Sequence, residues 1–292
     1  MTPERCKPPC ASPQDDGCLS LNPRPNKVRL WRCKLLPVSL RPIPVLLYHR
    51  IEPEGVENST AISTSVDVFG SHLHWLASNG YRSLTLPELA ARINGAEPYA
   101  ANEVVLTFDA GYSSLGELAV PILRETGLTA TAFLITQRVG KDDHLDWGNV
   151  RMLADEGVLD FHSHSHSHQR WPLGSVSVDD LVDDLATSRE TLATELGRPA
   201  DELAYLAWPY GRTCDAWDAA ASELGFTTQF VVQRGAVTRP ERHLRLPRLM
   251  VDGMPLPRFT KWMRTLSTRS GAHTSNRAFG TIRQLRSNPG YI

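Results

Sequence analysis

The chain has 292 residues, of which 41% are hydrophobic and 22% are charged, and its formal net charge is −1. These values are ordinary for a globular protein and exclude the strongly basic surface of nucleic-acid-binding domains. No apolar run approaches the roughly 18 residues that span a bilayer, so we expect neither a nucleic-acid partner nor a membrane span.

The N-terminal residues 1–41 differ in composition from the rest. They are rich in proline and contain four of the five cysteines, Cys6, Cys10, Cys18 and Cys33. The cysteine spacings match no common zinc module, and no apolar core precedes a small-residue cleavage site, as it does in a signal peptide. We expect a disordered extension here. The missing signal favours a cytoplasmic protein, and export stays open if the N-terminus is misassigned.

From residue 42 onward, apolar segments of strand length alternate with amphipathic segments of helix length. Predicted strands cover 43–48, 81–85, 103–108, 129–136, 157–161, 203–207, 226–232 and 244–251. Predicted helices cover 67–79, 88–94, 115–126, 147–156, 177–196 and 215–224. This alternation predicts a parallel α/β architecture, either a barrel or an open sheet. We assign residues 42–262 to one folded domain and residues 263–292 to a polar C-terminal tail.

Four histidines alternate with serines directly after the predicted strand 157–161: His162, His164, His166 and His168. In an extended backbone, alternate side chains point to the same side, and α/β folds bind ligands at the carboxyl ends of their strands. Neutral imidazole is the commonest metal ligand. The pattern therefore predicts a metal site that uses at least two of these histidines. An exposed tract that binds metals without specificity is the alternative.

Other polar residues also follow predicted strands, namely His49, Asp109 and Tyr210, and this placement favours a barrel with one functional rim. Two histidines and a carboxylate suffice for metal-assisted hydrolysis, in which the carboxylate takes a proton from the activated water. Asp109 could instead cap the following helix. The Pro209–Gly211 turn could aim a backbone N–H at a developing oxyanion, or be an ordinary turn.

Taken in order, these motifs resemble those of the polysaccharide deacetylase family, the NodB homology domain. The matching pieces are Thr107–Tyr112, Ser163–His168 and Trp208–Gly211, with Val45–Arg50 and Leu246–Arg248 on either side. The flanking pieces are similar to the branch that acts on poly-N-acetylglucosamine. The resemblance covers roughly residues 43–251 and implies a distorted (β/α) barrel, for which the alternating pattern predicts about seven parallel strands. It also implies that the protein removes N-acetyl groups from an acetylated glycan. The reaction would use a divalent metal, for which zinc is favoured and cobalt or nickel are the alternatives.

The resemblance also implies roles for individual residues. It makes Asp109 the general base and His164 and His168 the metal ligands. It gives the backbone amide of Tyr210 a share in binding the oxyanion. Pro209 and Arg248 then line the substrate, Arg248 close to the base, and His49 becomes a substrate-binding residue and a stand-in for the family's general acid.

One position departs from the family pattern. Ala110 occupies the place of the family's second aspartate, its third metal ligand, and alanine cannot coordinate. Three alternatives follow: water fills the gap, His162 substitutes as a ligand, or the protein has lost catalysis and kept glycan binding. Another barrel hydrolase, such as an amidohydrolase or a phosphoesterase, is less favoured because their histidine pair usually follows the first strand.

Overall fold

The computed structural model describes residues 42–54, 61–96, 99–170, 177–238 and 244–268. The chain divides into two compact units at residues 38 and 39, and all described residues belong to the second. The predicted extension 1–41 lies outside the described residues, as does the tail from 269 onward. No helix among the described residues is long and apolar enough to cross a membrane.

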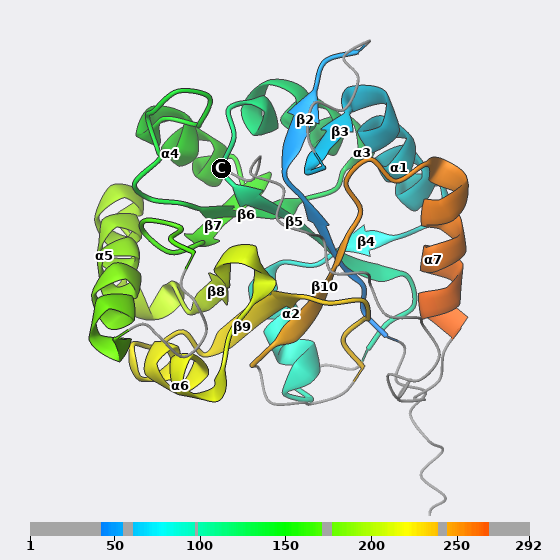
Figure 1. The fold of residues 1–292 in the computed structure, drawn as a ribbon. Coiled ribbons are helices and arrows are strands. Elements are labelled where there is room, and N and C mark those ends of the chain that lie inside the picture. The colour runs from blue at the N-terminus through cyan, green and yellow to red at the C-terminus, as the bar shows by residue number, and fades with distance from the viewer. Residues whose placement is uncertain (1–41, 55–60, 97–98, 171–176, 239–243, 269–292) are drawn as a thin grey trace, which may run out of the picture. The chain divides into compact units, whose positions relative to one another are not determined.

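Seven parallel strands form a closed barrel at the centre of the described unit (Figure 1), which confirms the predicted fold class. The order is β1-β10-β9-β8-β7-β6-β5, and the pairing of β1 with β5 closes the ring. The barrel strands are β1 (Val45–Tyr48), β5 (Glu103–Ala110), β6 (Ala130–Leu134), β7 (Leu159–Ser163), β8 (Tyr205–Ala207), β9 (Thr228–Val232) and β10 (Leu246–Met250). The short β4 (Arg82–Ser83) adds to β5, while β2 (Arg50–Glu52) and β3 (Ser63–Ser65) form a separate pair.

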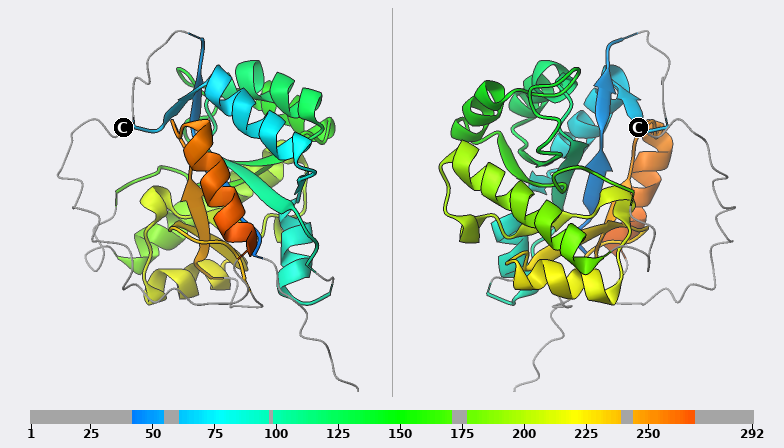
Figure 2. Two further views of the ribbon diagram at one scale, coloured as in Figure 1. Left: turned by 90° about the vertical axis from the view of Figure 1, so that its right-hand side faces the viewer. Right: turned by 60° about the vertical axis from the view of Figure 1, so that its left-hand side comes forward.

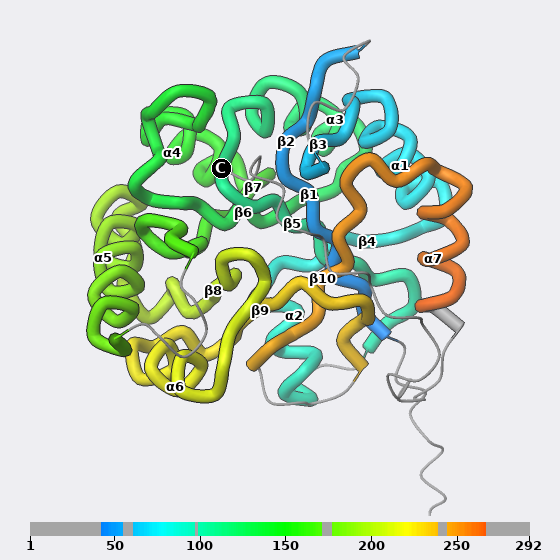
Figure 3. Tube along the Cα trace, in the orientation of Figure 1, coloured from blue at the N-terminus to red at the C-terminus, as the bar shows by residue number. Residues whose placement is uncertain are grey.

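Helices cover the outside of the barrel (Figures 2 and 3). They are α1 (Val66–Ser78), α3 (Val120–Thr126) after a π-helical turn (Leu115–Ala119), α4 (Trp147–Asp155), α5 (Val178–Leu196), α6 (Asp215–Glu223) and α7 (Leu256–Thr268). Helix α7 packs beside α1, and α5 packs beside α4 and α6. Short 3₁₀ turns, η2 (Ala200–Glu202) and η3 (Pro209–Gly211), precede and follow β8.

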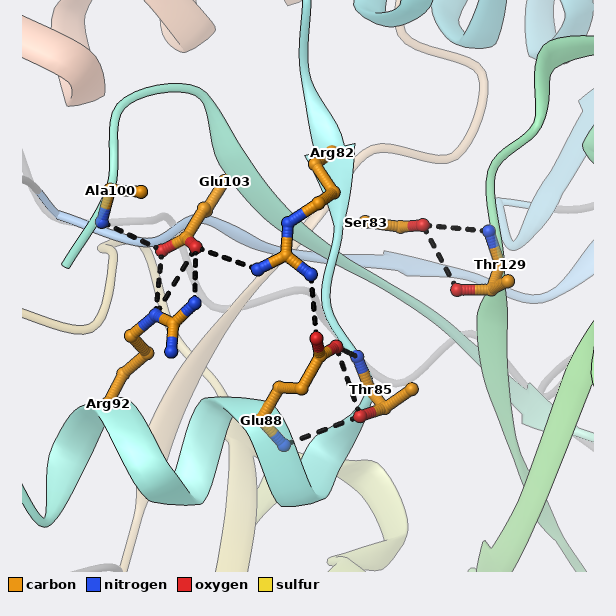
Figure 4. Close-up of polar contacts among 8 residues, drawn as sticks. All are labelled: Arg82, Ser83, Thr85, Glu88, Arg92, Ala100, Glu103 and Thr129. Atoms are coloured by element: carbon orange, nitrogen blue, oxygen red, sulfur yellow. Dashed lines mark hydrogen bonds and ion pairs between the residues drawn. The ribbon is translucent and has the colours of Figure 1, made fainter. Parts of the chain in front are cut away.

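Helix α2 (Leu86–Ile93) closes the barrel at the amino ends of its strands. Its apolar side chains belong to a buried cluster inside the barrel, toward the amino ends of the strands. This cluster includes Leu86, Leu89, Ile93, Val45, Val105, Phe133 and Phe230. Polar contacts fix α2 in place (Figure 4): Thr85 and Glu88 form a capping box, and Arg92 donates to the carboxylate of Glu103 at the start of β5. This end of the barrel is therefore sealed by packing.

The barrel interior changes from apolar to charged toward the carboxyl ends of the strands. Side chains alternate along a strand, so Val105, Thr107 and Asp109 of β5 face inward in successive layers. On β10, Arg248 reaches Thr107 Oγ1 at 3.4 Å and binds Asp109. The charged layer lies at the end where barrel enzymes place their active sites.

Helix α7 and the β2–β3 pair were not predicted. Helix α7 continues to Thr268, beyond the predicted start of the tail at residue 263. Its buried residues Phe259, Met263 and Leu266 recur at helical spacing and pack in the same cluster as α1. This apolar stripe explains why the helix persists in a polar stretch of sequence.

Candidate active site

Asp109 and Arg248 form a buried, two-pronged ion pair at the carboxyl end of the barrel. Arg248 Nη1 lies 2.6 Å from Asp109 Oδ1, and Nη2 lies 2.7 Å from Oδ2. Asp109 is 2% exposed and Arg248 is fully buried, with its guanidinium 5.2 Å from the Phe133 ring. Such a parallel arrangement fixes the plane of the carboxylate. The sequence-predicted base and the predicted arginine are therefore brought together.

The charges around Asp109 keep it ionised. Burial alone raises the pKa of this carboxyl, but Arg248 and the nearby His164 and His49 outweigh burial and hold the pKa well below its usual range. Asp109 is thus an acceptor at any ordinary pH.

His164 lies directly beyond β7 and faces Asp109. Its Nε2 is 3.6 Å from Asp109 Oδ2, and the residue is 2% exposed. Its Nδ1 lies 2.7 Å from the carbonyl oxygen of Ala207, and a carbonyl can only accept, so Nδ1 carries the proton. The tautomer therefore leaves the Nε2 lone pair turned toward the site, as metal-binding histidines require.

His168 joins His164 because the chain turns after β7. The two ring centroids are 4.8 Å apart. Ser165 and His168 adopt positive φ angles of 67° and 55°, and the His168 N–H donates to Ser165 Oγ. Burial, together with His164, lowers the pKa of His168 to about 3, so its imidazole is neutral and able to coordinate.

The four histidines of the tract do not share one face. His166 Nδ1 lies 2.9 Å from Thr136 Oγ1. His162 Nε2 lies 2.9 Å from Asp160 Oδ2, and with Asp160 and Arg198 it lines a separate cavity of about 270 Å³ toward the amino ends of the strands. The contacts therefore do not bring His162 to Asp109, and the extended backbone assumed from the alternating pattern ends at Ser163.

The turn after β8 supplies Tyr210 and Pro209. Tyr210 has φ 56° and ψ 11°, and its ring centroid is 4.6 Å from that of His168. The Gly211 and Arg212 amides donate to carbonyls of the turn, whereas the Tyr210 amide has no acceptor among the described residues. The strained turn thus leaves one N–H free beside the histidine pair.

His49 follows β1 and is held by Asp252, which the sequence reasoning missed. The His49 N–H and Nδ1 lie 3.0 and 2.7 Å from the two oxygens of Asp252, and Thr64 Oγ1 donates to the same carboxylate. Burial lowers the pKa of His49, but Asp252 outweighs it and raises the pKa overall, with Asp109 adding to the rise. A carboxylate directly after the last predicted strand was the available signal.

The donor set fits a metal only in part. His164 and His168 offer neutral imidazoles, but Asp109 is engaged by Arg248, and Ala110 provides no ligand. Within the described part of the chain, no group of three His, Cys, Asp or Glu side chains could hold a metal ion. Ala110 adopts φ 73°, a conformation in which Asn and Asp are several-fold enriched and alanine is uncommon.

The sequence is similar to proteins that are described as polysaccharide deacetylases. A sequence profile described as polysaccharide deacetylase matches residues 96–229. The chain is 25% identical over 210 residues to the putative polysaccharide deacetylase YxkH of Bacillus subtilis (strain 168), covering 72% of this chain and 71% of that protein. It is 26% identical over 230 residues to a poly-beta-1,6-N-acetyl-D-glucosamine N-deacetylase of Staphylococcus epidermidis, covering 71% and 78%.

Solved structures have the same fold. The Streptococcus pyogenes deacetylase PplD in complex with acetate superposes with a TM-score of 0.68 at 23% identity, covering 76% of this chain and 98% of that one. IcaB from Ammonifex degensii gives a TM-score of 0.67 at 22% identity, covering 76% and 97%. The chain is thus similar in sequence to polysaccharide deacetylases and shares the fold of these solved deacetylases.

Proposed function

We propose that the protein is a metal-dependent hydrolase that removes N-acetyl groups from a glycan containing N-acetylglucosamine. Relatives that match most of this chain are named as a putative polysaccharide deacetylase and as N-deacetylases of poly-beta-1,6-N-acetyl-D-glucosamine. The observation that carries the proposal is the buried carboxylate of Asp109, 3.6 Å from His164 Nε2. His168 completes an imidazole pair at the same position.

His164 and His168 are the residues that would hold the cation, zinc in the first place and cobalt or nickel otherwise. Such a cation would supply Lewis-acid chemistry there, because it would polarise the acetamide carbonyl and lower the pKa of the attacking water. Asp109 then takes the proton of the attacking water, with its orientation fixed by Arg248. The free N–H of Tyr210 donates to the oxyanion that develops on the carbonyl oxygen.

His49 donates a proton to the departing sugar nitrogen. Its Nδ1–H is held by Asp252, so Nε2 is the atom that gains and loses the proton. The raised pKa keeps a larger fraction of His49 protonated near neutral pH. This assignment places an acid and a base on separate strands of one rim.

Acetate release from N-acetylglucosamine oligomers tests the proposal. The protein is stripped of metal with a chelator and then reloaded with Zn²⁺, Co²⁺ or Ni²⁺. We expect release only after reloading. Absence of release from any acetylated glycan, with protein that is folded by circular dichroism, would overturn the proposal.

Ala110 supports a second candidate, a glycan-binding relative with impaired catalysis. The side chain that would complete the ligand set is missing, although the backbone keeps a conformation that suits aspartate. Ala110→Asp separates the two candidates. Metal binding and deacetylation that occur only in the variant would favour the binding protein, whereas an active natural protein would exclude it.

A further inference from the structure

A small hollow lies beside the candidate active site, between the loop after β7 and the turn after β8. Its volume is about 40 Å³, and its lining residues are Gln169, Arg170, Pro209, Tyr210, Arg212 and Trp217. The lining contains two guanidinium groups and no carboxylate. We call it the arginine hollow.

The two arginines of the hollow have no carboxylate partner among the described residues. Elsewhere, arginines such as Arg82, Arg92 and Arg198 pair with glutamate or aspartate. Residues 171–176, which follow Arg170, contain no aspartate or glutamate. Two like charges brought to one small space repel each other unless an anion joins them.

Three carboxylates of the helices beside these loops, on α5 and α6, already have other partners. Asp184 accepts from the N–H groups of His166 and Ser167, with both distances 2.9 Å. Asp215 and Asp218 on α6 both bind Arg245. Among the described residues no carboxylate pairs with Arg170 or Arg212, so the hollow presents positive charge to an anionic ligand.

Tyr210 joins the hollow to the reaction site. Its ring centroid lies 4.6 Å from that of His168, and the guanidinium carbon of Arg170 lies 5.6 Å from the same Tyr210 centroid. A sugar whose acetamide lies at His164 and His168 would place its neighbour or its substituent near the hollow. Guanidinium groups suit carboxylate and phosphate because their planar donors match both anions.

We propose that the arginine hollow binds the negatively charged group of an acidic glycan, a carboxylate or a phosphate on or next to the N-acetylated sugar. This inference rests on the proposed deacetylase function and names its substrate class. Neutral and acidic N-acetylglucosamine glycans then differ as substrates, and the difference comes from Arg170 and Arg212.

The test compares oligosaccharides that differ only in charge. One set carries a carboxylate on the sugar next to N-acetylglucosamine, a second is its methyl ester, and a third carries a phosphate monoester instead. We expect kcat/KM for either acidic form to exceed that for the ester by about tenfold at low salt, and the ratio to fall as salt rises. A preference for the carboxylate alone or for the phosphate alone identifies the source of the anion.

The double variant Arg170→Gln/Arg212→Gln should bring the ratio to about one. Arg258→Gln is the matched control, because Arg258 is an exposed arginine on the distant helix α7, and it should keep the ratio. Equal kcat/KM for acid and ester in the natural protein, or a ratio that persists in the double variant, overturns the inference.

Equilibrium binding of the same oligosaccharides separates the two proposals. Tighter binding of the acidic form by the natural protein, lost in the double variant, supports the arginine hollow even where no acetate is released. In that case the deacetylase proposal fails alone. Acetate release without any difference in binding or in kcat/KM means that the hollow does not select for charge.

Discussion

Arg248 holds both carboxylate oxygens of Asp109, at 2.6 and 2.7 Å, inside the barrel and away from water. The pair joins β10 to β5, two strands that are far apart in the sequence. Breaking a buried pair by removing one partner is far more costly than removing both, because the remaining charge stays buried without compensation.

Replacing Arg248 with methionine should lower the free energy of unfolding by about 3–5 kcal/mol. The double variant Arg248→Met/Asp109→Leu should lose less than Arg248→Met alone, because no unpaired charge remains. Urea unfolding measures both. A double variant that is less stable than the single one would contradict the account of this pair.

The same pair predicts how stability depends on pH. The folded pKa of Asp109 is lowered, so its contribution is present above the unfolded pKa of about 3.9 and is lost as the pH falls through the folded value. The natural protein should therefore lose stability on acidification below about pH 4. The free energy of unfolding of Arg248→Met should fall less over the same pH range, which urea unfolding at several pH values can check.

Asp252 should set the upper pH limit of activity through His49. Because the folded pKa of His49 is raised, the acid form persists to higher pH, and activity falls as the pH rises through that value. Asp252→Asn removes the charge that raises the pKa, so the alkaline limb of kcat against pH should move to lower pH. His74→Gln is the control, since His74 also has a raised pKa but pairs with Glu125 on the outer surface. An unmoved limb in Asp252→Asn would remove His49 from the role of acid.

Ala110 should be a strained position. Its φ of 73° suits glycine better than alanine, so Ala110→Gly should raise the free energy of unfolding by about 1 kcal/mol. The matched control is Ala132→Gly in β6, a buried alanine outside the positive-φ group, which should lower it by a similar amount. Equal losses in both variants would mean that Ala110 carries no strain.

The barrel could be predicted because its strands and helices alternate with clear apolar periods. Asp109, His164 and His168 could be placed because each lies at or beyond the carboxyl end of a predicted strand, and parallel strands end at one rim. The position of His162 could not, because it lies inside β7, where it contacts Asp160 and lines the separate cavity. The turn that brings His168 to His164 begins at Ser165, and Asp184, far along the sequence, holds this turn.

The role of Asp252 as the partner of His49 was not predicted, for a related reason. Nothing local to this residue shows that its partner is His49, 203 positions earlier in the chain. The pairing follows only from the closed ring, in which β1 lies beside β10. Helix α7 was missed because its polar content hides an apolar stripe of few residues.

The central claim is that Asp109 takes the proton of a water that attacks a glycan acetamide. Acetate release by the natural protein and by Asp109→Asn, each loaded with Zn²⁺ and assayed on N-acetylglucosamine oligomers, tests it most directly. We predict a loss of about 10²–10⁴-fold or more in the variant, while the bound metal, measured by elemental analysis, stays the same. Equal release from both proteins would contradict the claim.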